Sequence, residues 1–377
     1  MRAKRLGLLG AVLVLIAVDV VVARVDVLGR LAPGSRPTSL LASITRQLVD
    51  VASALSGRQP ATVVFLGNSQ MEAAVRPLGA LRGHLVAAGA PADVSAASLC
   101  VFATAPTDAE AVSRHFGRLR PRVAVLGLSA PDLATPLARA RDMPLRRLLD
   151  VGWRAGPVPP AGLEERLDRW ARTVWHLYRY RQLFRFVLFP PDEPRTPASR
   201  LEATLSLREL LVESYGAERA HDLLSLRQAA LASGTWPAIA AYVDALRGEG
   251  YRAGLRERWH GLEPADVQVE ALHRFAANTR AAGTLPVWVL LPENPWLERD
   301  PVVGAEVARR SGRVAERVRA EARAAGVPLV DLRDALAPRA FLDLNHLAYN
   351  RGDLMPALAA GVAAAVGWAS SEAEQAP

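Results

Sequence analysis

Cysteine and lysine are nearly missing from the 377-residue sequence, and the scarcity of cysteine excludes whole classes of site. The single cysteine, Cys100, leaves no internal disulfide and no zinc site built from cysteines. It lies in an apolar run, and we interpret it as a small buried hydrophobic residue. Lys4 is the one lysine, so nearly all of the 46 basic residues are arginine, which indicates biased coding composition more than a selected function.

The sequence also lacks a concentrated block of charge. The 46 basic and 38 acidic residues leave a net charge of +8, but arginine is interleaved with Glu and Asp along helix-like segments. A nucleic-acid-binding protein usually gathers its positive charge in a stripe or a tail, so we expect no nucleic-acid partner. Hydrophobic residues make up 50% of the chain, and its 27 Gly and 27 Pro show no period, which excludes a disordered or collagen-like polypeptide.

The longest apolar run lies close to the N-terminus. Residues 6–23 carry a single charge, Asp19, and follow the basic residues of positions 1–5. A bilayer core needs about 17–25 apolar residues, and basic residues before the run place the N-terminus in the cytoplasm. The sequence therefore predicts a single-pass transmembrane anchor in residues 1–24 and a stalk over 25–60. The main domain, residues 61–377, is expected in the periplasm or outside the cell.

Alternatives remain open for this N-terminal part. Val21 and Ala23 fit the small positions before a cleavage site, so a removed signal peptide is the second interpretation. Asp19 is expected either near the outer membrane interface or paired within a membrane complex. Residues 33–37, Pro-Gly-Ser-Arg-Pro, are interpreted as a chain breaker within the stalk.

From residue 61 onward, short apolar runs alternate with helix-like stretches. The expected strands are residues 61–67, 94–102, 122–129, 285–292 and 327–332. The expected helices are residues 71–88, 107–119, 267–282, 302–325 and 351–369. This alternation predicts an α/β fold, a three-layer flavodoxin-like sandwich around a five-stranded parallel sheet. Ligands of such sheets bind beyond the carboxyl ends of the strands.

Residues 130–266 interrupt the alternation and are expected to form a helical insertion without strands. Five of the eight tryptophans lie there. Within it, residues 170–189 combine seven aromatic side chains and four arginines with no acid. Such a segment could lie on an anionic membrane surface or stack on sugar rings. The alternative is a helix whose aromatic side chains face the core while arginine stems cover its edge.

A candidate nucleophile follows the first expected strand, in the turn Gly67-Asn68-Ser69-Gln70. A serine between a strand and a helix presents its hydroxyl at the edge of the sheet. The N–H groups at the start of the helix favour negative charge that develops nearby. Serine is also a common N-cap residue, so this turn alone is weak evidence.

A candidate base lies in the loop before the last helix. His346 follows Asp343 by three residues, and it alone of the seven histidines lies just past a strand with an acid at useful spacing. The carboxylate can hold one imidazole nitrogen while the other accepts a proton from a nucleophile. We expect the remaining histidines to be surface or packing residues, except His176 and His260, whose partners the sequence does not show.

Together the two segments resemble the SGNH (GDSL) hydrolase superfamily, which has its serine after the first strand and Asp-x-x-His before the last helix. The phrase Phe-x-Asp-x-x-His-Leu-x-x-x-x-Gly, from Phe341 to Gly352, carries most of the resemblance. It implies Ser69 as nucleophile, His346 as general base and Asp343 as the residue that orients it. The implied activity is serine-dependent acyl transfer or ester hydrolysis, with no metal and no organic cofactor.

Several positions depart from the family pattern. Asn68 stands where the family has Asp, Ala103 and Thr104 stand where an oxyanion Gly is usual, and Ser129 replaces an Asn. The residues expected to bind substrate or an oxyanion are Asn68, Ala103, Thr104, Ser129 and Asn294. Losing one oxyanion donor costs about 10²–10³ in turnover, so a catalytically weak or inactive protein that binds glycan or acts as a scaffold is the alternative function.

These departures, with the predicted anchor, resemble a divergent membrane-anchored branch that includes the alginate O-acetylation and teichoic-acid D-alanylation proteins. The loop Pro292-Glu293-Asn294-Pro295 is similar to that branch, although a simple Pro-bracketed turn explains it equally well. The resemblance implies a polysaccharide or acyl-ester substrate in the cell envelope. It also implies a partner, either a membrane-bound O-acyltransferase or polymer-export machinery.

Overall fold

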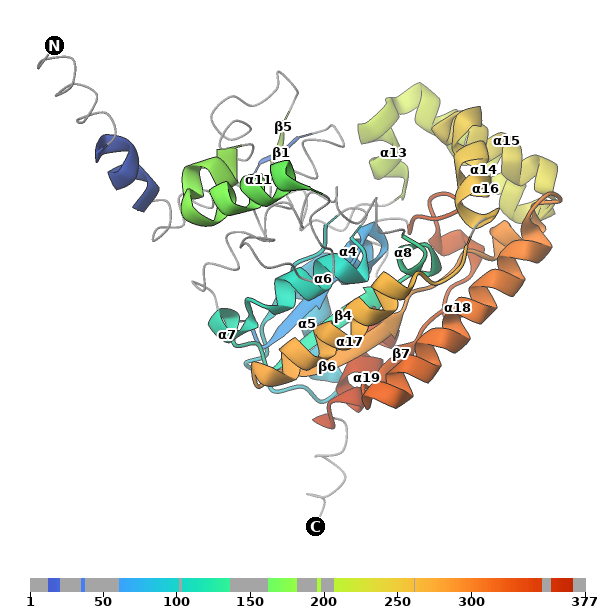
Figure 1. Ribbon diagram of the computed structural model, residues 1–377. Coiled ribbons are helices and arrows are strands. Elements are labelled where there is room, and N and C mark those ends of the chain that lie inside the picture. The colour runs from blue at the N-terminus through green and yellow to red at the C-terminus, as the bar shows by residue number, and fades with distance from the viewer. Residues whose placement is uncertain are drawn as a thin grey trace, which may run out of the picture.

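A computed structural model of the chain describes residues 13–20, 35–37, 61–101, 104–135, 162–181, 195–197, 207–260, 262–347 and 354–368. Within these residues the protein is an α/β structure, with a parallel sheet at its centre and helices on both faces (Figure 1). The predicted fold class is therefore confirmed at the level of an all-parallel, five-stranded α/β sheet.

The sheet contains the five predicted strands, each shorter than its apolar run. They are β2 (Val63–Leu66), β3 (Ala96–Ser98), β4 (Val123–Leu128), β6 (Leu285–Leu290) and β7 (Leu329–Asp331). Their order across the sheet is β3-β2-β4-β6-β7, and every neighbouring pair is parallel. Counted along the chain this is the 2-1-3-4-5 order of doubly wound sheets, whose ligands bind where the order reverses, between β2 and β4.

Alternate residues of each strand enter two separate cores. Val64 and Leu66 of β2 pack on one face of the sheet, and Val63 and Phe65 pack on the other. All six residues of β4 are buried, as expected for a central strand that helices cover on both sides. This two-sided burial explains why the strands appear in the sequence as continuous apolar runs.

The covering helices follow the predicted stretches, with two divisions. They are α4 (Ser69–Val75), α5 (Leu78–Ala87), α6 (Pro106–Ser113), α7 (Phe116–Leu119), α17 (Asp266–Ala281), α18 (Gly304–Ala325) and α19 (Met355–Ala365). The expected helix 71–88 is two helices, because Pro77 has no N–H to continue α4. The expected helix 107–119 is likewise divided, at residues 114–115. Helices α5 and α19 cover one face, while α6, α17 and α18 cover the other.

Helices dominate the chain between β4 and β6, as predicted. They are α8 (Ala130–Leu133), α11 (Leu163–Val174), α13 (Leu207–Tyr215), α14 (Ala217–Ser233), α15 (Trp236–Arg247) and α16 (Glu249–His260). One expectation is wrong, because β5 (Arg195–Pro197) pairs antiparallel with β1 (Ser35–Pro37), the segment interpreted as a breaker in the stalk. A three-residue edge strand containing proline leaves no periodic signal in a sequence.

Part of the predicted N-terminal anchor lies among the described residues. Residues 13–20 form a helix, and no helix among the described residues has the length and apolar character needed to span a membrane. The rest of the predicted anchor, residues 1–12 and 21–24, lies outside the described residues.

Cys100 is buried, and burial raises the pKa of its thiol to about 12, so its interpretation as a small hydrophobic residue is confirmed.

Candidate active site

The turn that carries Ser69 is set by a glycine. Gly67 follows β2 with φ +149°, and a Cβ there would lie 2.8 Å from Cβ of Met71 and 3.1 Å from the Gly127 carbonyl oxygen. A side chain at this position would push the start of α4 away from the end of β4. The close approach places Ser69, the first residue of α4, at the carboxyl edge of the sheet, where its side chain is half-buried.

Asn68, rather than Ser69, caps helix α4. Its Oδ1 accepts from the amides of Gln70 (2.9 Å) and Met71 (3.4 Å). Its Nδ2 donates to Asp132 Oδ2 (2.8 Å) and to Ser129 Oγ (3.1 Å). Two of the amide groups at the start of the helix, those of Gln70 and Met71, are therefore already satisfied by the chain itself.

Ser129 belongs to the same buried network. Its hydroxyl and its amide both donate to Asp132 Oδ2, at 2.7 and 2.9 Å. A hydroxyl has one proton, and the Ser129 proton is used inside the protein. The network thus binds the end of β4 to the turn that holds Ser69.

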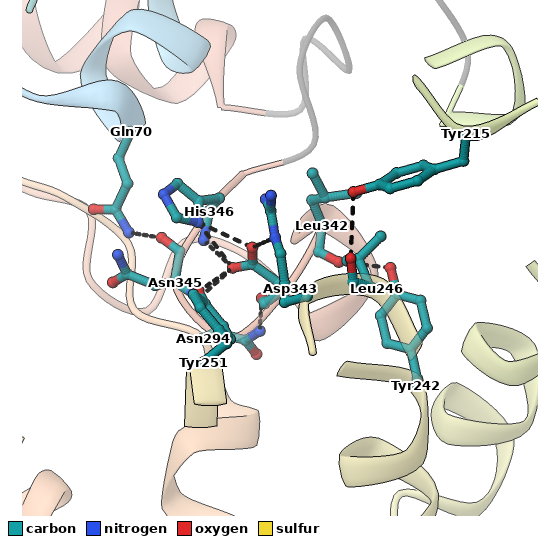
Figure 2. Close-up of polar contacts among 11 residues, drawn as sticks. Gln70, Tyr215, Tyr242, Leu246, Tyr251, Asn294, Leu342, Asp343, Asn345 and His346 are labelled. Atoms are coloured by element: carbon teal, nitrogen blue, oxygen red, sulfur yellow. Dashed lines mark hydrogen bonds and ion pairs between the residues drawn. The ribbon is translucent and has the colours of Figure 1, made fainter. Parts of the chain in front are cut away.

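Asp343 and His346 are brought together in the loop between β7 and α19, as predicted (Figure 2). Nδ1 of His346 lies 3.0 Å from both carboxylate oxygens of Asp343. Oδ1 of Asp343 also accepts from the amides of Asn345 and His346, each at 2.8 Å. A carboxylate only accepts hydrogen bonds, so Nδ1 carries the proton and Nε2 is the basic nitrogen.

The Asp343 carboxylate is fully buried yet ionised. Burial on its own raises the pKa of Asp343. The charge and hydrogen bond of His346, the charge of Arg247 and the Asn345 amide outweigh burial and hold that pKa well below its ordinary value. The carboxylate therefore keeps its charge throughout the range in which histidine titrates.

Two residues of the helical segment between β4 and β6 reach the same carboxylate. Arg247, at the end of α15, donates from Nε to Oδ2 (2.8 Å), and Tyr251 of α16 donates from its hydroxyl to Oδ1 (2.9 Å). Behind them, the Tyr242 hydroxyl donates to the Leu342 carbonyl (2.6 Å), and Arg227 donates to the Phe341 carbonyl (3.1 Å). The insertion thus clamps the Asp343 loop.

No spacing or motif in the sequence indicates these contacts to the Asp343 loop. Arg247 and Tyr251 lie 96 and 92 residues from Asp343, on two helices of the segment between β4 and β6. A tyrosine and an arginine four residues apart are ordinary helix residues in an arginine-rich chain.

A hydrogen bond links the two predicted segments directly. Nε2 of Gln70, the residue after Ser69, donates to the carbonyl of Asn345, the residue before His346 (2.5 Å; Figure 2). Within the described part of the chain, no hydrogen bond joins the Ser69 hydroxyl to His346. Catalytic hydrogen bonds are often long before substrate binds and tighten in the substrate complex.

The other predicted binding residues support the loops around the site. Asn294 caps the short 3-10 helix Pro295–Arg299, and its Nδ2 donates to the Asp343 carbonyl (2.8 Å). The Thr104 hydroxyl donates to the Val101 carbonyl (2.6 Å). Ala103 lies outside the described residues. Asn294 thus also holds the backbone of Asp343 in place.

No group of three or more His, Cys, Asp and Glu side chains is arranged to hold a metal ion in the described ranges. Comparison of the chain with protein-family models, curated proteins and solved structures found no match. Function therefore has to be argued from the geometry of Ser69, Asp343 and His346 and from the groups that hold them.

Proposed function

We propose that the protein is a membrane-anchored, SGNH-like acyl-ester enzyme with a flavodoxin-like core, acting on a polysaccharide of the cell envelope. The observation that carries this proposal is the fully buried, ionised Asp343 with His346 Nδ1 at 3.0 Å, in a loop bound to the Ser69 turn through Gln70. A buried carboxylate that fixes an imidazole beside a serine turn fits a base, its orienting residue and a nucleophile.

The proposed reaction proceeds in two balanced steps. The Ser69 oxygen attacks the acyl carbonyl carbon while Nε2 of His346 takes the hydroxyl proton, and the donor alcohol leaves with that proton. A sugar hydroxyl then attacks the acyl-serine, gives its proton to His346, and regenerates Ser69 as the acyl group is transferred. If water replaces the sugar hydroxyl, the product is a free carboxylic acid and the enzyme is an esterase.

A serine-directed fluorophosphonate tests the nucleophile. We expect the full-length chain in detergent to be labelled at Ser69, and the Ser69→Ala variant to lose labelling. Ser225→Ala is the matched control, because Ser225 is exposed on α14 and its hydroxyl contacts only the carbonyl of His221 one turn earlier. Equal labelling of all three proteins would contradict the proposed nucleophile.

A non-catalytic scaffold or glycan-binding protein is the second candidate function. It is favoured because the protons of the Ser129 and Thr104 hydroxyls are donated inside the protein and Asn68 caps the amides of Gln70 and Met71. In cells, Ser69→Ala and His346→Ala should both abolish polymer acylation if the protein is an enzyme. If both support normal acylation while deletion does not, the scaffold function is correct.

The proposed partner is a membrane-bound O-acyltransferase that supplies the acyl group, or the machinery that exports the polymer. Hydrolysis of p-nitrophenyl acetate by the full-length chain separates transferase from esterase. Fast hydrolysis without any acceptor indicates an esterase, whereas labelling at Ser69 with slow hydrolysis indicates that a hydroxyl acceptor completes the reaction.

A further inference from the structure

The apolar face of helix α11 is exposed, whereas the arginines on its opposite face are buried. The apolar side chains recur every three or four residues, and about half or more of each is exposed: Leu163 67%, Leu167 50%, Trp170 51% and Val174 53%. On the opposite face, Arg169 and Arg172 are only 4% and 7% exposed, and they pair with Glu165 and Asp168 one turn earlier. A surface helix of a water-soluble domain has the reverse arrangement.

A second exposed apolar surface adjoins the end of α11. The helical residues 13–20 expose their six large apolar side chains by 44–63%. Asp19 of this segment accepts a hydrogen bond from the Leu177 amide (2.6 Å) and lies 3.2 Å from Nδ1 of His176. Asp19 therefore joins the apolar N-terminal helix to residues two and three positions after the end of α11. Figure 1 shows this helix beside α11.

We propose that α11 lies in the interfacial layer of the bilayer that receives the N-terminal segment, with the stripe Leu163, Leu167, Trp170 and Val174 facing the lipid. The proposal rests on the proposed membrane anchor. Asp19 sets how deeply the N-terminal helix enters the bilayer, because a carboxylate at the end of an inserted helix stays at the headgroup level. His176 and Leu177, which hold Asp19, lie at that level too, and α11 leads away from it along the membrane surface.

The residues beyond the stripe suit this depth. Trp175 stacks on Tyr178 (ring centroids 5.8 Å apart), and the guanidinium of Arg181 lies 3.8 Å over the Tyr178 ring. Tryptophan and tyrosine concentrate at membrane–water interfaces, and arginine there meets the phosphates of anionic lipids. Aromatic side chains and a cation thus cluster at the end of α11 that Asp19 ties to the apolar N-terminal segment.

The scarcity of cysteine makes the inference directly testable. Cys100 is buried with a raised thiol pKa, so a cysteine introduced at Leu167→Cys can be labelled selectively with a nitrobenzoxadiazole dye. Glu164→Cys is the matched control, because Glu164 is also exposed on α11 but lies outside the apolar stripe. Both full-length variants are reconstituted into vesicles of phosphatidylcholine and phosphatidylglycerol.

We expect a blue-shifted dye at position 167 that doxyl-labelled lipids quench at least twofold more strongly than the dye at position 164. Equal quenching at both positions would overturn the inference. A blue shift at 167 without lipid quenching would also overturn it, and would show that protein covers the stripe. Flotation of the wild-type chain with the vesicles tests the anchor separately, because a chain that floats with an unquenched position 167 keeps the anchor and loses only this inference.

Discussion

The side chain of Gln70 donates a hydrogen bond to the carbonyl of Asn345, across 275 positions of sequence. These two residues flank Ser69 and His346, the proposed nucleophile and base. The bond therefore fixes the distance between two loops that leave different strands of the sheet. Further hydrogen bonds fix both ends of this link. The Gln70 amide donates to the Asn68 side chain, and the Asn345 amide donates to the Asp343 carboxylate.

Replacing the donor at this link should impair the site without unfolding it. In Gln70→Glu a carboxylate oxygen faces the Asn345 carbonyl, so the two acceptors repel and the loops separate. Because a misplacement of about 1 Å can cost 10²-fold in rate, we expect fluorophosphonate labelling of Ser69 to slow at least tenfold. Gln228→Glu, on the exposed face of α14, is the control and should label at the wild-type rate. Unchanged labelling in Gln70→Glu would show that the link does not align the two loops.

The sequence predicted the contact between Asp343 and His346, but it did not predict the residues that hold Asp343 in place. Ser69 and the Asp343–His346 pair lie at turns whose spacing is local, so a single sequence records them. Arg247, Tyr251 and Asn294 act on Asp343 from three other elements, and contacts across 49–96 positions leave no spacing to detect. The same reason explains the missed β1–β5 pairing and the missed partner of Asp19.

The ionised state of Asp343 predicts a pH-dependent contribution to stability. Its pKa is lower in the folded chain than the value of about 3.9 in an unfolded chain, so its contribution is complete above about pH 5 and is lost as the pH falls toward the folded pKa. Asp343→Asn leaves Arg247 without its buried counter-charge and should lower the free energy of unfolding by about 3–5 kcal/mol at pH 7.

Urea unfolding of the full-length chain at pH 7 and pH 3.5 measures this difference. The loss caused by Asp343→Asn should be smaller at pH 3.5, because the wild type has itself lost part of the contribution there. Asp244→Asn provides the comparison, since its partly exposed pair with Arg252 contributes less than about 1 kcal/mol at either pH. A loss for Asp343→Asn that is the same at both pH values would show that the carboxylate is not the stabilising form.

The network of Asn68, Ser129 and Asp132 should stabilise the fold and position Ser69 at the same time. Asp132 Oδ2 accepts from the Ser129 amide, the Ser129 hydroxyl and Asn68 Nδ2, all in buried surroundings. In Asp132→Asn one carboxylate oxygen becomes an amide group that opposes a donor. A buried donor left unpaired costs about 1–3 kcal/mol, and we expect a loss of that size in urea unfolding at pH 7. Asp222→Asn, exposed on α14, should change stability by less than about 0.5 kcal/mol. Because Asn68 caps the helix that begins at Ser69, Asp132→Asn should also slow fluorophosphonate labelling, and an unchanged labelling rate with lowered stability would restrict the network to a structural role.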